Sequence, residues 1–441
     1  MASSMIYIPP VKDCSYIDIE ANMAVHINDT FTNKNVFKIS DSLKEEELPL
    51  LTYDFKSKKW LTGRYIGKLF FNYNNQEYCF EVIPRFGNAA VMQLLEEIFN
   101  IKLAHSKSKN NLENKVHNEL IKKLISIIWV KQLSKANVHG LPKNILKREH
   151  KGQTVKGRID IRKTVLPLYN ESVLISNSIE KQTDSTIIAI LHKAYKILTK
   201  DYFLSQNMLT DGVKEVIISA ASYKHKSITK NQYQSIKYGS MYANYKAIVD
   251  FSWQIIQRKN NTISQEQSKD TNDALFLDMA EIWENYLMTI LKKKYSIGGW
   301  KVYSSKFNIY KSKDFKRGLI PDIILEKDDN VVVLDAKYKR MTTNFRDYDR
   351  EDFFQIHTYG AFMQSQNKKV LGLGLIYPLL ENFDQPQLES NFSHTLFGDS
   401  FSESWFKVDG IKLTESLEDL TVQKEAFLSR FQTNLSMYYV R

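Results

Sequence analysis

The sequence predicts a multidomain protein that combines α/β and α+β domains. Its 441 residues are about three typical domain lengths, so two or three folding units are expected. Apolar residues alternate in the first hundred positions, recur with a 3.6-residue period in the middle, and mark alternating helices and strands after about residue 273. We therefore expect a β-rich N-terminal domain (1–100), a basic, mainly helical middle region (101–259), a linker (260–272) and an α/β domain with a mixed sheet (273–441).

The N-terminal domain is predicted from a hairpin pattern. Residues 65–73 and 77–84 alternate apolar and other side chains on either side of Asn74, Asn75 and Gln76, as expected for two strands and a turn. Short apolar runs at 5–8, 16–19 and 23–27 suggest further strands. A helix over 89–98 is expected at the end of this domain.

The middle region carries a helical stripe that begins near residue 111. Leu112, Val116, Leu120, Leu124 and Ile127 recur at helical spacing. Segments 186–201 and 241–258 continue the pattern. A basic connecting region with Gly140, Pro142, Gly152 and Gly157 interrupts it before residue 186. In 260–272 the only large apolar residue is Ile263, which is typical of a linker.

The net charge of +11 is concentrated in one segment. Residues 101–165 contain 16 Lys and Arg against 4 Asp and Glu, whereas residues 1–100 contain 10 against 13. A basic block of this kind attracts a polyanion such as DNA or RNA through counterion release. A lysine-rich solvated helix surface or a contact with an acidic partner is the alternative.

Several classes of protein are excluded by composition and motifs. No apolar run approaches the roughly 20 residues of a membrane span, and the N-terminus lacks the apolar core of a signal peptide, so a cytoplasmic protein is expected. Cys14 and Cys79 do not provide a zinc framework. There is no G-x-x-x-x-G-K-[ST] loop and no G-x-S-x-G elbow, so we expect no nucleotide bound by this chain and no serine-hydrolase site.

The chemically informative part of the sequence is a hairpin in the last domain. Strands over 319–326 and 331–337 flank the polar turn at 327–330. If the turn is symmetric about Asp328 and Asp329, Asp322 faces Asp335 across the two strands. Opposed residues have Cβ atoms about 4.5–5.5 Å apart, and two carboxylates so placed repel each other unless a cation compensates.

A magnesium ion fits this arrangement. Mg²⁺ prefers carboxylate and carbonyl oxygens, so Asp322, Asp335 and the Ala336 carbonyl are the expected ligands, with Mn²⁺ as a substitute. Lys337 lies two residues beyond Asp335 and therefore points to the same face. Two carboxylates, a metal ion and an ammonium group suit phosphodiester hydrolysis.

Three residues on neighbouring helices are further candidates. Glu284 falls in the apolar stripe of a helix expected over 274–294, as a buried structural acid or as another catalytic carboxylate and metal ligand. Gln355 and Tyr359 lie one turn apart on a helix over 350–366, where they either support the site or DNA contact, or simply pack. Taken alone, an Asp-x-Lys such as Asp335 and Lys337 at a strand end is more often a surface ion pair than a catalytic site.

Together these residues resemble the signature of the PD-(D/E)xK nucleases, which have a restriction-endonuclease-like fold. Pro321-Asp322, then Asp335-Ala336-Lys337, with Glu284 on the preceding helix, follow that pattern. A narrower resemblance is to McrC, the nuclease subunit of McrBC-type modification-dependent restriction systems. It rests on Phe276-Leu277-Asp278-Met279, Trp283-Glu284, Gly157-Arg158-Ile159 and Ile83-Pro84-Arg85-Phe86-Gly87.

The resemblance implies a Mg²⁺-dependent endonuclease subunit of a restriction and defence complex. Its motor would be a separate AAA+ GTPase of the McrB type, which recognises modified DNA and translocates, and the N-terminal domain would dock on that motor. The candidate contacts to double-stranded DNA are Lys143, Lys147, Arg148, Lys156, Arg158, Arg162, Lys163, Lys316, Arg317, Lys339 and Arg340. The alternatives are a free-standing repair or recombination nuclease, and a non-catalytic adaptor of an AAA+ ring.

Overall fold

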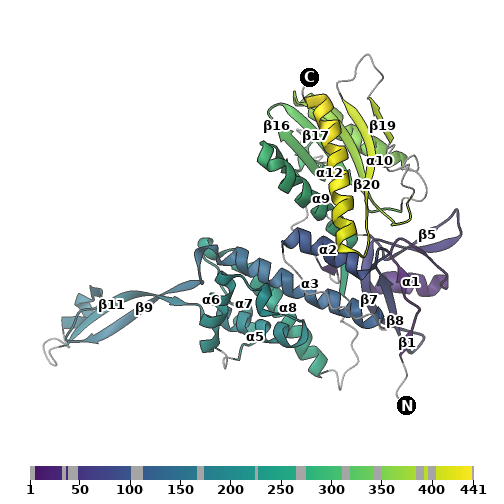
Figure 1. Cartoon of the computed structure of the whole chain (residues 1–441). Coiled ribbons are helices and arrows are strands. Elements are labelled where there is room, and N and C mark those ends of the chain that lie inside the picture. Colours follow the sequence, from purple (N-terminus) through teal and green to yellow (C-terminus); the bar gives the residue numbers. More distant parts are fainter. Residues whose placement is uncertain are drawn as a thin grey trace. The chain divides into compact units, whose positions relative to one another are not determined.

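The computed structural model places two compact units along the chain (Figure 1). The first unit comprises residues 1–121 and 271–441, and the second comprises residues 122–270. Among the described residues, no helix is both long and apolar enough to cross a membrane. The structure describes residues 5–31, 36–37, 48–100, 113–165, 173–223, 227–264, 275–309, 318–340, 349–383, 392–395 and 404–439.

The N-terminal part of the first unit is built on a sheet of order β1-β8-β7-β12-β4, to which β2 adds by pairing with β8. A second sheet has the order β3-β6-β5. Buried side chains such as Phe31, Leu69, Phe80 and Phe276 form the core. The elements are β1 (Ile6–Tyr7), β2 (Val11–Lys12), β3 (Tyr16–Ile17), α1 (Ala21–Thr30), β4 (Val36–Phe37), β5 (Leu51–Asp54), β6 (Lys59–Thr62), β7 (Tyr65–Tyr73), β8 (Gln76–Ile83), α2 (Gly87–Phe99) and β12 (Leu275–Asp278).

The expected hairpin is confirmed by β7 and β8, which pair antiparallel with Tyr73 opposite Gln76. The turn consists of Asn74 and Asn75, whose φ angles are 51° and 61°. Asparagine tolerates this left-handed region better than most residues, which suits a two-residue turn. The strand expected over 23–27 is wrong, because this segment lies in α1 and buries Ala24 and Ile27 three residues apart.

The helices and strands on either side of the expected linker differ from the prediction. Helix α8 (Tyr245–Ser264) continues into the expected linker, and residues 265–274 lie outside the described residues. The helix expected over 274–294 begins only at Met279, because Leu275–Asp278 forms β12 and pairs with β7 and β4. A short apolar run is compatible with a helix or a strand. Here the segment forms a strand, because Phe276 and Leu277 are buried in the N-terminal sheet. The domain boundaries themselves stay a prediction.

The second unit is mainly helical, but its basic connecting region forms a β-ribbon. Strands β9 (Lys143–Gly152) and β11 (Leu174–Thr183) pair antiparallel over their full length, and β10 (Arg158–Ile159) adds to β11. Figure 1 shows this ribbon projecting from the helices of its unit. The other elements are α3 (Glu113–Ala136), α5 (Ser185–Asp201), α6 (Asp211–Ala220), α7 (Lys230–Gln234), α8 and the 3₁₀ turns η2 (Asn137–His139), η3 (Gln206–Met208), η4 (Ala221–Tyr223) and η5 (Ser240–Tyr242).

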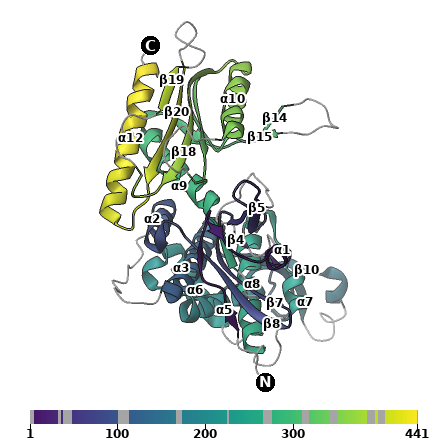
Figure 2. The same cartoon turned by 90° about the vertical axis from the view of Figure 1, so that its right-hand side faces the viewer.

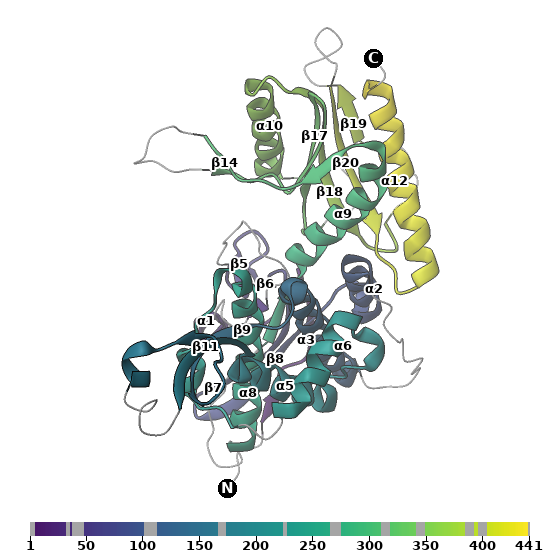
Figure 3. The ribbon, with the colours of Figure 1, turned by 90° about the vertical axis from the view of Figure 1, so that its left-hand side faces the viewer.

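The C-terminal part of the first unit contains the expected mixed sheet, of order β13-β16-β17-β18-β20-β19. Pairing is parallel between β17, β18 and β20 and antiparallel elsewhere. Helix α10 covers one face, and α9 and α12 cover the other (Figures 2 and 3). The elements are α9 (Met279–Tyr295), η6 (Ser296–Gly298), β13 (Lys301–Tyr303), β14 (Phe307–Asn308), β15 (Gly318–Leu319), β16 (Ile323–Lys327), β17 (Asn330–Ala336), α10 (Arg350–Ser365), β18 (Lys369–Leu379), β19 (Phe392–Thr395), β20 (Trp405–Lys412) and α12 (Leu417–Tyr439).

Candidate active site

The register of the β16–β17 hairpin agrees with the prediction. Ile323 pairs with Leu334 and Glu326 pairs with Val331, so Asp322 stands opposite Asp335 one step beyond the last paired residue. Both aspartates are buried, with exposures of 2% and 0%. Val331 to Leu334 are buried in the sheet core, which places the two acids at the end of an apolar strand pair. Such strand ends are a common position for active sites in α/β proteins.

A backbone hydrogen bond fixes Asp322 relative to the second strand. Its Oδ2 accepts from the N–H of Ala336 at 2.8 Å. On its other side, β17 is held by β18, since the N–H of Lys337 donates to the Ile376 carbonyl at 2.9 Å. The segment Asp335-Ala336-Lys337 is therefore clamped between Asp322 and β18.

The ammonium group of Lys337 lies among carboxylates. Its Nζ is 2.5 Å from Asp335 Oδ2 and 3.2 Å from Asp352 Oδ1. Burial by itself would lower the pKa of Lys337, but Asp335 raises it, and Asp352 and Asp322 add to this effect, so that the pKa is above its ordinary value. Lys337 is thus a largely buried cation at neutral pH, with its side chain 12% exposed.

Gln355 and Tyr359, both on α10, join this cluster. Lys337 Nζ donates to Gln355 Oε1 at 2.7 Å, and Gln355 Nε2 donates to the Tyr359 hydroxyl at 2.8 Å. The Tyr359 hydroxyl in turn donates to the carbonyl of Ile320, two residues before Asp322. The chain of hydrogen bonds therefore returns to the segment that carries Asp322, just before β16, and includes both Gln355 and Tyr359.

The sequence prediction missed Asp352. This residue is 3% exposed and contacts Lys337, and both of its oxygens accept from Lys339 Nζ at 3.0 Å. Asp352, Gln355 and Tyr359 are spaced i, i+3, i+7 on α10, so they share one face of the helix. This helical spacing relative to Gln355 and Tyr359 could have identified Asp352 from the sequence.

Glu284 lies on α9 at the edge of the buried face rather than within it. It is half-buried, whereas Trp283 and Leu287 beside it are fully buried. Asp278 caps this helix by accepting from the N–H of Ala280 and pairs with Arg64 at 3.0 Å. Asp278 and Glu284 both line the cavity that Asp322 and Lys337 also line.

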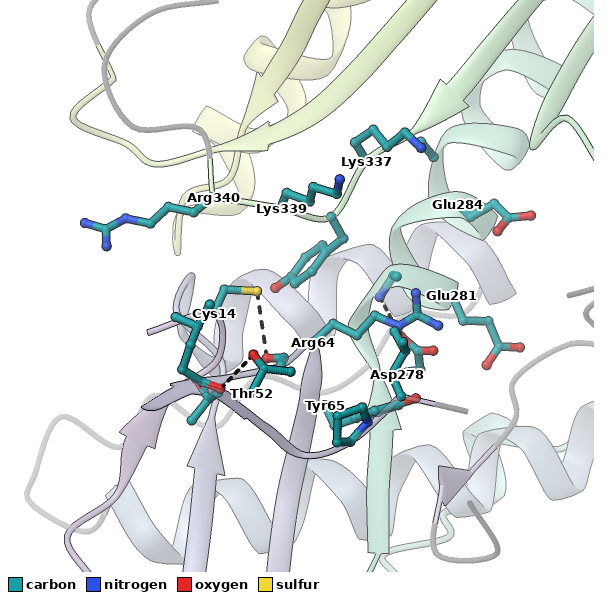
Figure 4. A pocket seen from close by; sticks show the side chains of 18 of the residues that line it. Cys14, Thr52, Arg64, Tyr65, Asp278, Glu281, Glu284, Lys337, Lys339 and Arg340 are labelled. Carbon is teal, nitrogen blue, oxygen red and sulfur yellow. Dashed lines mark hydrogen bonds and ion pairs between the residues drawn. The ribbon is translucent and has the colours of Figure 1, made fainter. Parts of the chain in front are cut away.

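One cavity of about 880 Å³ connects these groups. Figure 4 shows Lys337, Lys339 and Arg340 on one side of it, Glu281 and Glu284 on α9, and Cys14, Thr52 and Arg64 from the N-terminal part of the unit. Asp322, Ala336, Asp352 and Gln355 also line it. The cavity is therefore shared by the N-terminal sheets and the C-terminal domain of the first unit.

The oxygen atoms of these residues are of the chemical kind that binds a hard divalent cation. Asp322 and Asp335 are buried carboxylates on facing strand ends, and Glu284 and Ala336 line the same cavity as Asp322. Oxygen donors of this kind are what Mg²⁺ prefers. Among the described residues, however, no three His, Cys, Asp or Glu side chains lie close enough together to hold a metal ion as they stand.

The comparisons with known proteins decide the family. A family model described as "McrBC 5-methylcytosine restriction system component" matches residues 61–378, which is well over half of the chain. The chain belongs to this family. The match includes β7–β8, the basic ribbon and all the residues of the cluster described above. No curated protein matches the chain.

Two solved structures resemble this McrBC family member at 10% sequence identity. The first is a chain of a half-complex of Thermococcus gammatolerans McrB AAA+ hexamers with bound McrC; the TM-score is 0.47, with 97% of this chain and 100% of that chain covered. The second is a chain of the cryo-EM structure of the Thermococcus gammatolerans McrBC complex; the TM-score is 0.32, with 65% and 87% covered.

The predicted DNA-contacting residues of this McrBC family member fall into several groups. On the ribbon, Lys143 and Lys147 are exposed on one face, whereas Arg148 is on the other face and pairs with Glu180 at 3.1 Å. Lys163 pairs with Glu149. Lys156, Arg158 and Arg162 are exposed, Lys339 and Arg340 line the cavity, and Lys316 and Arg317 lie outside the described residues.

Proposed function

We propose that this McrBC family member is a metal-dependent DNA endonuclease that hydrolyses phosphodiester bonds. The observation that carries the proposal is the position of Lys337, whose ammonium contacts Asp335, the aspartate opposite Asp322 on the paired strand. Two buried acids on facing strand ends with an adjacent cation form an arrangement suited to a phosphate and an attacking water. This chemistry is that of the PD-(D/E)xK nucleases that the sequence resembles.

The site needs a divalent cation for this role, and Asp322, Asp335, Glu284 and the Ala336 carbonyl are the groups that would hold it. When bound, Mg²⁺ would polarise the phosphate and lower the pKa of a coordinated water. Lys337 supplies a fixed positive charge beside the place where negative charge develops on the phosphate. Asp352 and Gln355 orient Lys337, and Tyr359 orients Gln355.

We further propose that the chain acts in the cytoplasm with a separate AAA+ GTPase of the McrB type, which recognises modified DNA and translocates along it. Membership of a family of restriction-system components supports this partner. The sequence supports it as well, because the chain has no Walker A motif of its own and needs another protein to hydrolyse nucleotide. The exposed lysines of the ribbon and the cavity-lining Lys339 and Arg340 are the proposed contacts to the DNA backbone.

The test is cleavage of plasmid DNA by the full-length protein with its partner GTPase, with Asp335→Asn as the matched variant. Methylated and unmethylated plasmids are compared with Mg²⁺ and GTP, and again with EDTA in place of Mg²⁺. We expect cutting of methylated plasmid that requires the cation, the nucleotide and Asp335. Cutting without partner or nucleotide would favour a free-standing nuclease, and unchanged restriction of phage by the Asp335→Asn variant in cells would favour an adaptor.

A further inference from the structure

Arg85 forms a buried contact between the N-terminal β-sheet and the segment that follows Lys337. Its guanidinium carbon lies 4.6 Å from the centre of the Tyr338 ring and 4.7 Å from the centre of the Phe86 ring. Its Nη2 donates to the Lys339 carbonyl at 3.1 Å. The Arg85 side chain is only 7% exposed, and both rings are buried. The two ring contacts are therefore shielded from water, which strengthens the attraction between a cation and an aromatic ring.

The anchor of Arg85 on the N-terminal side is Asp13. The carboxylate of Asp13 is fully buried, accepts from the backbone N–H of Arg85 and lies 3.8 Å from Arg85 Nε. Asp13 is itself fixed, because its N–H donates to the carbonyl of Ile83 in β8. On the N-terminal side the guanidinium group therefore lies against Asp13, and on the other side it contacts Tyr338 and Lys339.

Strand β17 ends at Ala336, so the sheet does not hold Tyr338 and Lys339, the two residues that Arg85 contacts. The backbone of Lys337 still bonds to β18, but Tyr338 and Lys339 have left the sheet. Arg85 holds both of these residues, one through its ring and the other through its carbonyl. The path of the chain directly after Lys337 is thus fixed by a residue more than 250 positions earlier.

A second connection reaches Lys337 through side chains. Lys339, whose carbonyl binds Arg85, places its ammonium on Asp352, and the same carboxylate contacts the ammonium of Lys337. Contacts therefore run without a gap from Asp13 through Arg85 and Lys339 to Asp352 and Lys337.

We propose that Arg85 is a positioning residue for phosphodiester cleavage, which fixes the backbone after Lys337 and couples the N-terminal sheet to the geometry of the site. This inference rests on the proposed nuclease function. A displacement of about 1 Å in a positioned group can lower a rate by about 100-fold. Arginine can stack on two aromatic rings and donate a hydrogen bond at the same time because its guanidinium group is planar, whereas the ammonium group of lysine is not.

The experiment compares Arg85→Ala and Arg85→Lys with the wild type in the full-length protein and its partner complex. Single-turnover cleavage is measured at saturating DNA, and DNA affinity and folded fraction are measured in the same samples. We expect the cleavage rate per folded molecule to fall by about 10- to 100-fold in Arg85→Ala, and less in Arg85→Lys, with DNA affinity changed less than about twofold. Tyr338→Leu, which removes the ring, should resemble Arg85→Ala.

Lys293→Gln is the matched control, because Lys293 pairs with Glu97 at 2.7 Å and so also joins the N-terminal region to α9, without touching residues 336–340. It should leave the rate per folded molecule unchanged. If Lys293→Gln lowers the rate as much as Arg85→Ala does, or if Arg85→Ala cuts at the wild-type rate, the positioning role is wrong.

Amide hydrogen exchange gives a second readout that does not depend on cleavage. In Arg85→Ala the peptide containing residues 337–340 should exchange at least about 10-fold faster, whereas β7 and β8 should be unchanged. If the wild type fails to cut DNA, the proposed function is wrong. The exchange measurement would still test whether Arg85 fixes residues 337–340. Unchanged exchange in 337–340 would show that Arg85 does not fix them.

Discussion

The carboxylate of Asp322 accepts a hydrogen bond of 2.8 Å from the backbone N–H of Ala336, the residue between Asp335 and Lys337. Asp322 therefore has two separable roles. Its oxygen shapes the end of the hairpin, and its charge stands opposite that of Asp335. An asparagine at this position can still accept the backbone hydrogen bond but carries no charge.

Replacing Asp322 with Asn should consequently abolish cleavage without opening the hairpin. We expect a loss of at least about 100-fold in the rate of DNA cleavage by the partner complex, since a charged group at the reacting centre is removed. Asp322→Ala should lose the same activity and also show faster amide exchange around Ala336. If Asp322→Asn cuts DNA normally, its carboxylate has no catalytic role.

Asp352 should affect the cleavage rate because its carboxylate positions Lys337 and Lys339. In Asp352→Asn the ammonium groups of Lys337 and Lys339 lose a charged partner, so Lys337 is less firmly placed. We expect cleavage to fall about 10- to 100-fold, in the range seen when a group that orients a metal or catalytic residue is removed. Glu351→Gln, an exposed neighbour on the same helix, is the control and should cut at the wild-type rate.

The hairpin could be predicted from the sequence because its information is local. The polar turn at Asp328 and Asp329 fixes the register, and a fixed register places Asp322 opposite Asp335. The apolar run from Val331 to Leu334 identifies a buried strand for the same reason. No distant part of the chain was needed.

The elements that were missed depend on partners far away in sequence. Strand β12 pairs with β7 and β4, which precede it by some 200 residues, so nothing beside it in the sequence specifies a strand. The β9 strand is polar and mostly exposed on both faces, and therefore lacks the alternation by which half-buried strands are recognised. Asp352 becomes part of the site only when α10 packs against the sheet.

The ribbon offers a test of DNA binding with an internal comparison. Lys143 and Lys147 are exposed on one face, whereas Arg148 on the other face is already paired with Glu180. Lys143→Gln with Lys147→Gln should weaken DNA binding and reduce the slope of log affinity against log salt by about 2, because each lysine would neutralise one DNA phosphate. Arg148→Gln should change both quantities less. Unchanged DNA affinity in the double variant, with weaker binding to the partner GTPase, would assign this face to the partner.

Glu326 on β16 predicts a pH dependence of stability. Its Oε1 pairs with Lys368 at 2.8 Å and its Oε2 accepts from the Tyr303 hydroxyl at 2.6 Å. The hydrogen bond from Lys368, followed by that from Tyr303, lowers the pKa of Glu326 below its ordinary value. A carboxyl group whose pKa is lower in the folded state stabilises the fold above its unfolded pKa of about 4.3, and this contribution is lost as the pH falls through the folded pKa.

Glu326→Gln should therefore destabilise the first unit slightly at pH 7, because solvent screens this ion pair, and the difference from the wild type should shrink as the pH is lowered below about 4. Urea unfolding of both proteins between pH 3 and pH 7 measures this difference. The control is Asp328→Asn, in the exposed turn of the same hairpin, which should show a smaller difference. A Glu326→Gln difference that stays constant across this range would mean that the charge of Glu326 does not stabilise the hairpin.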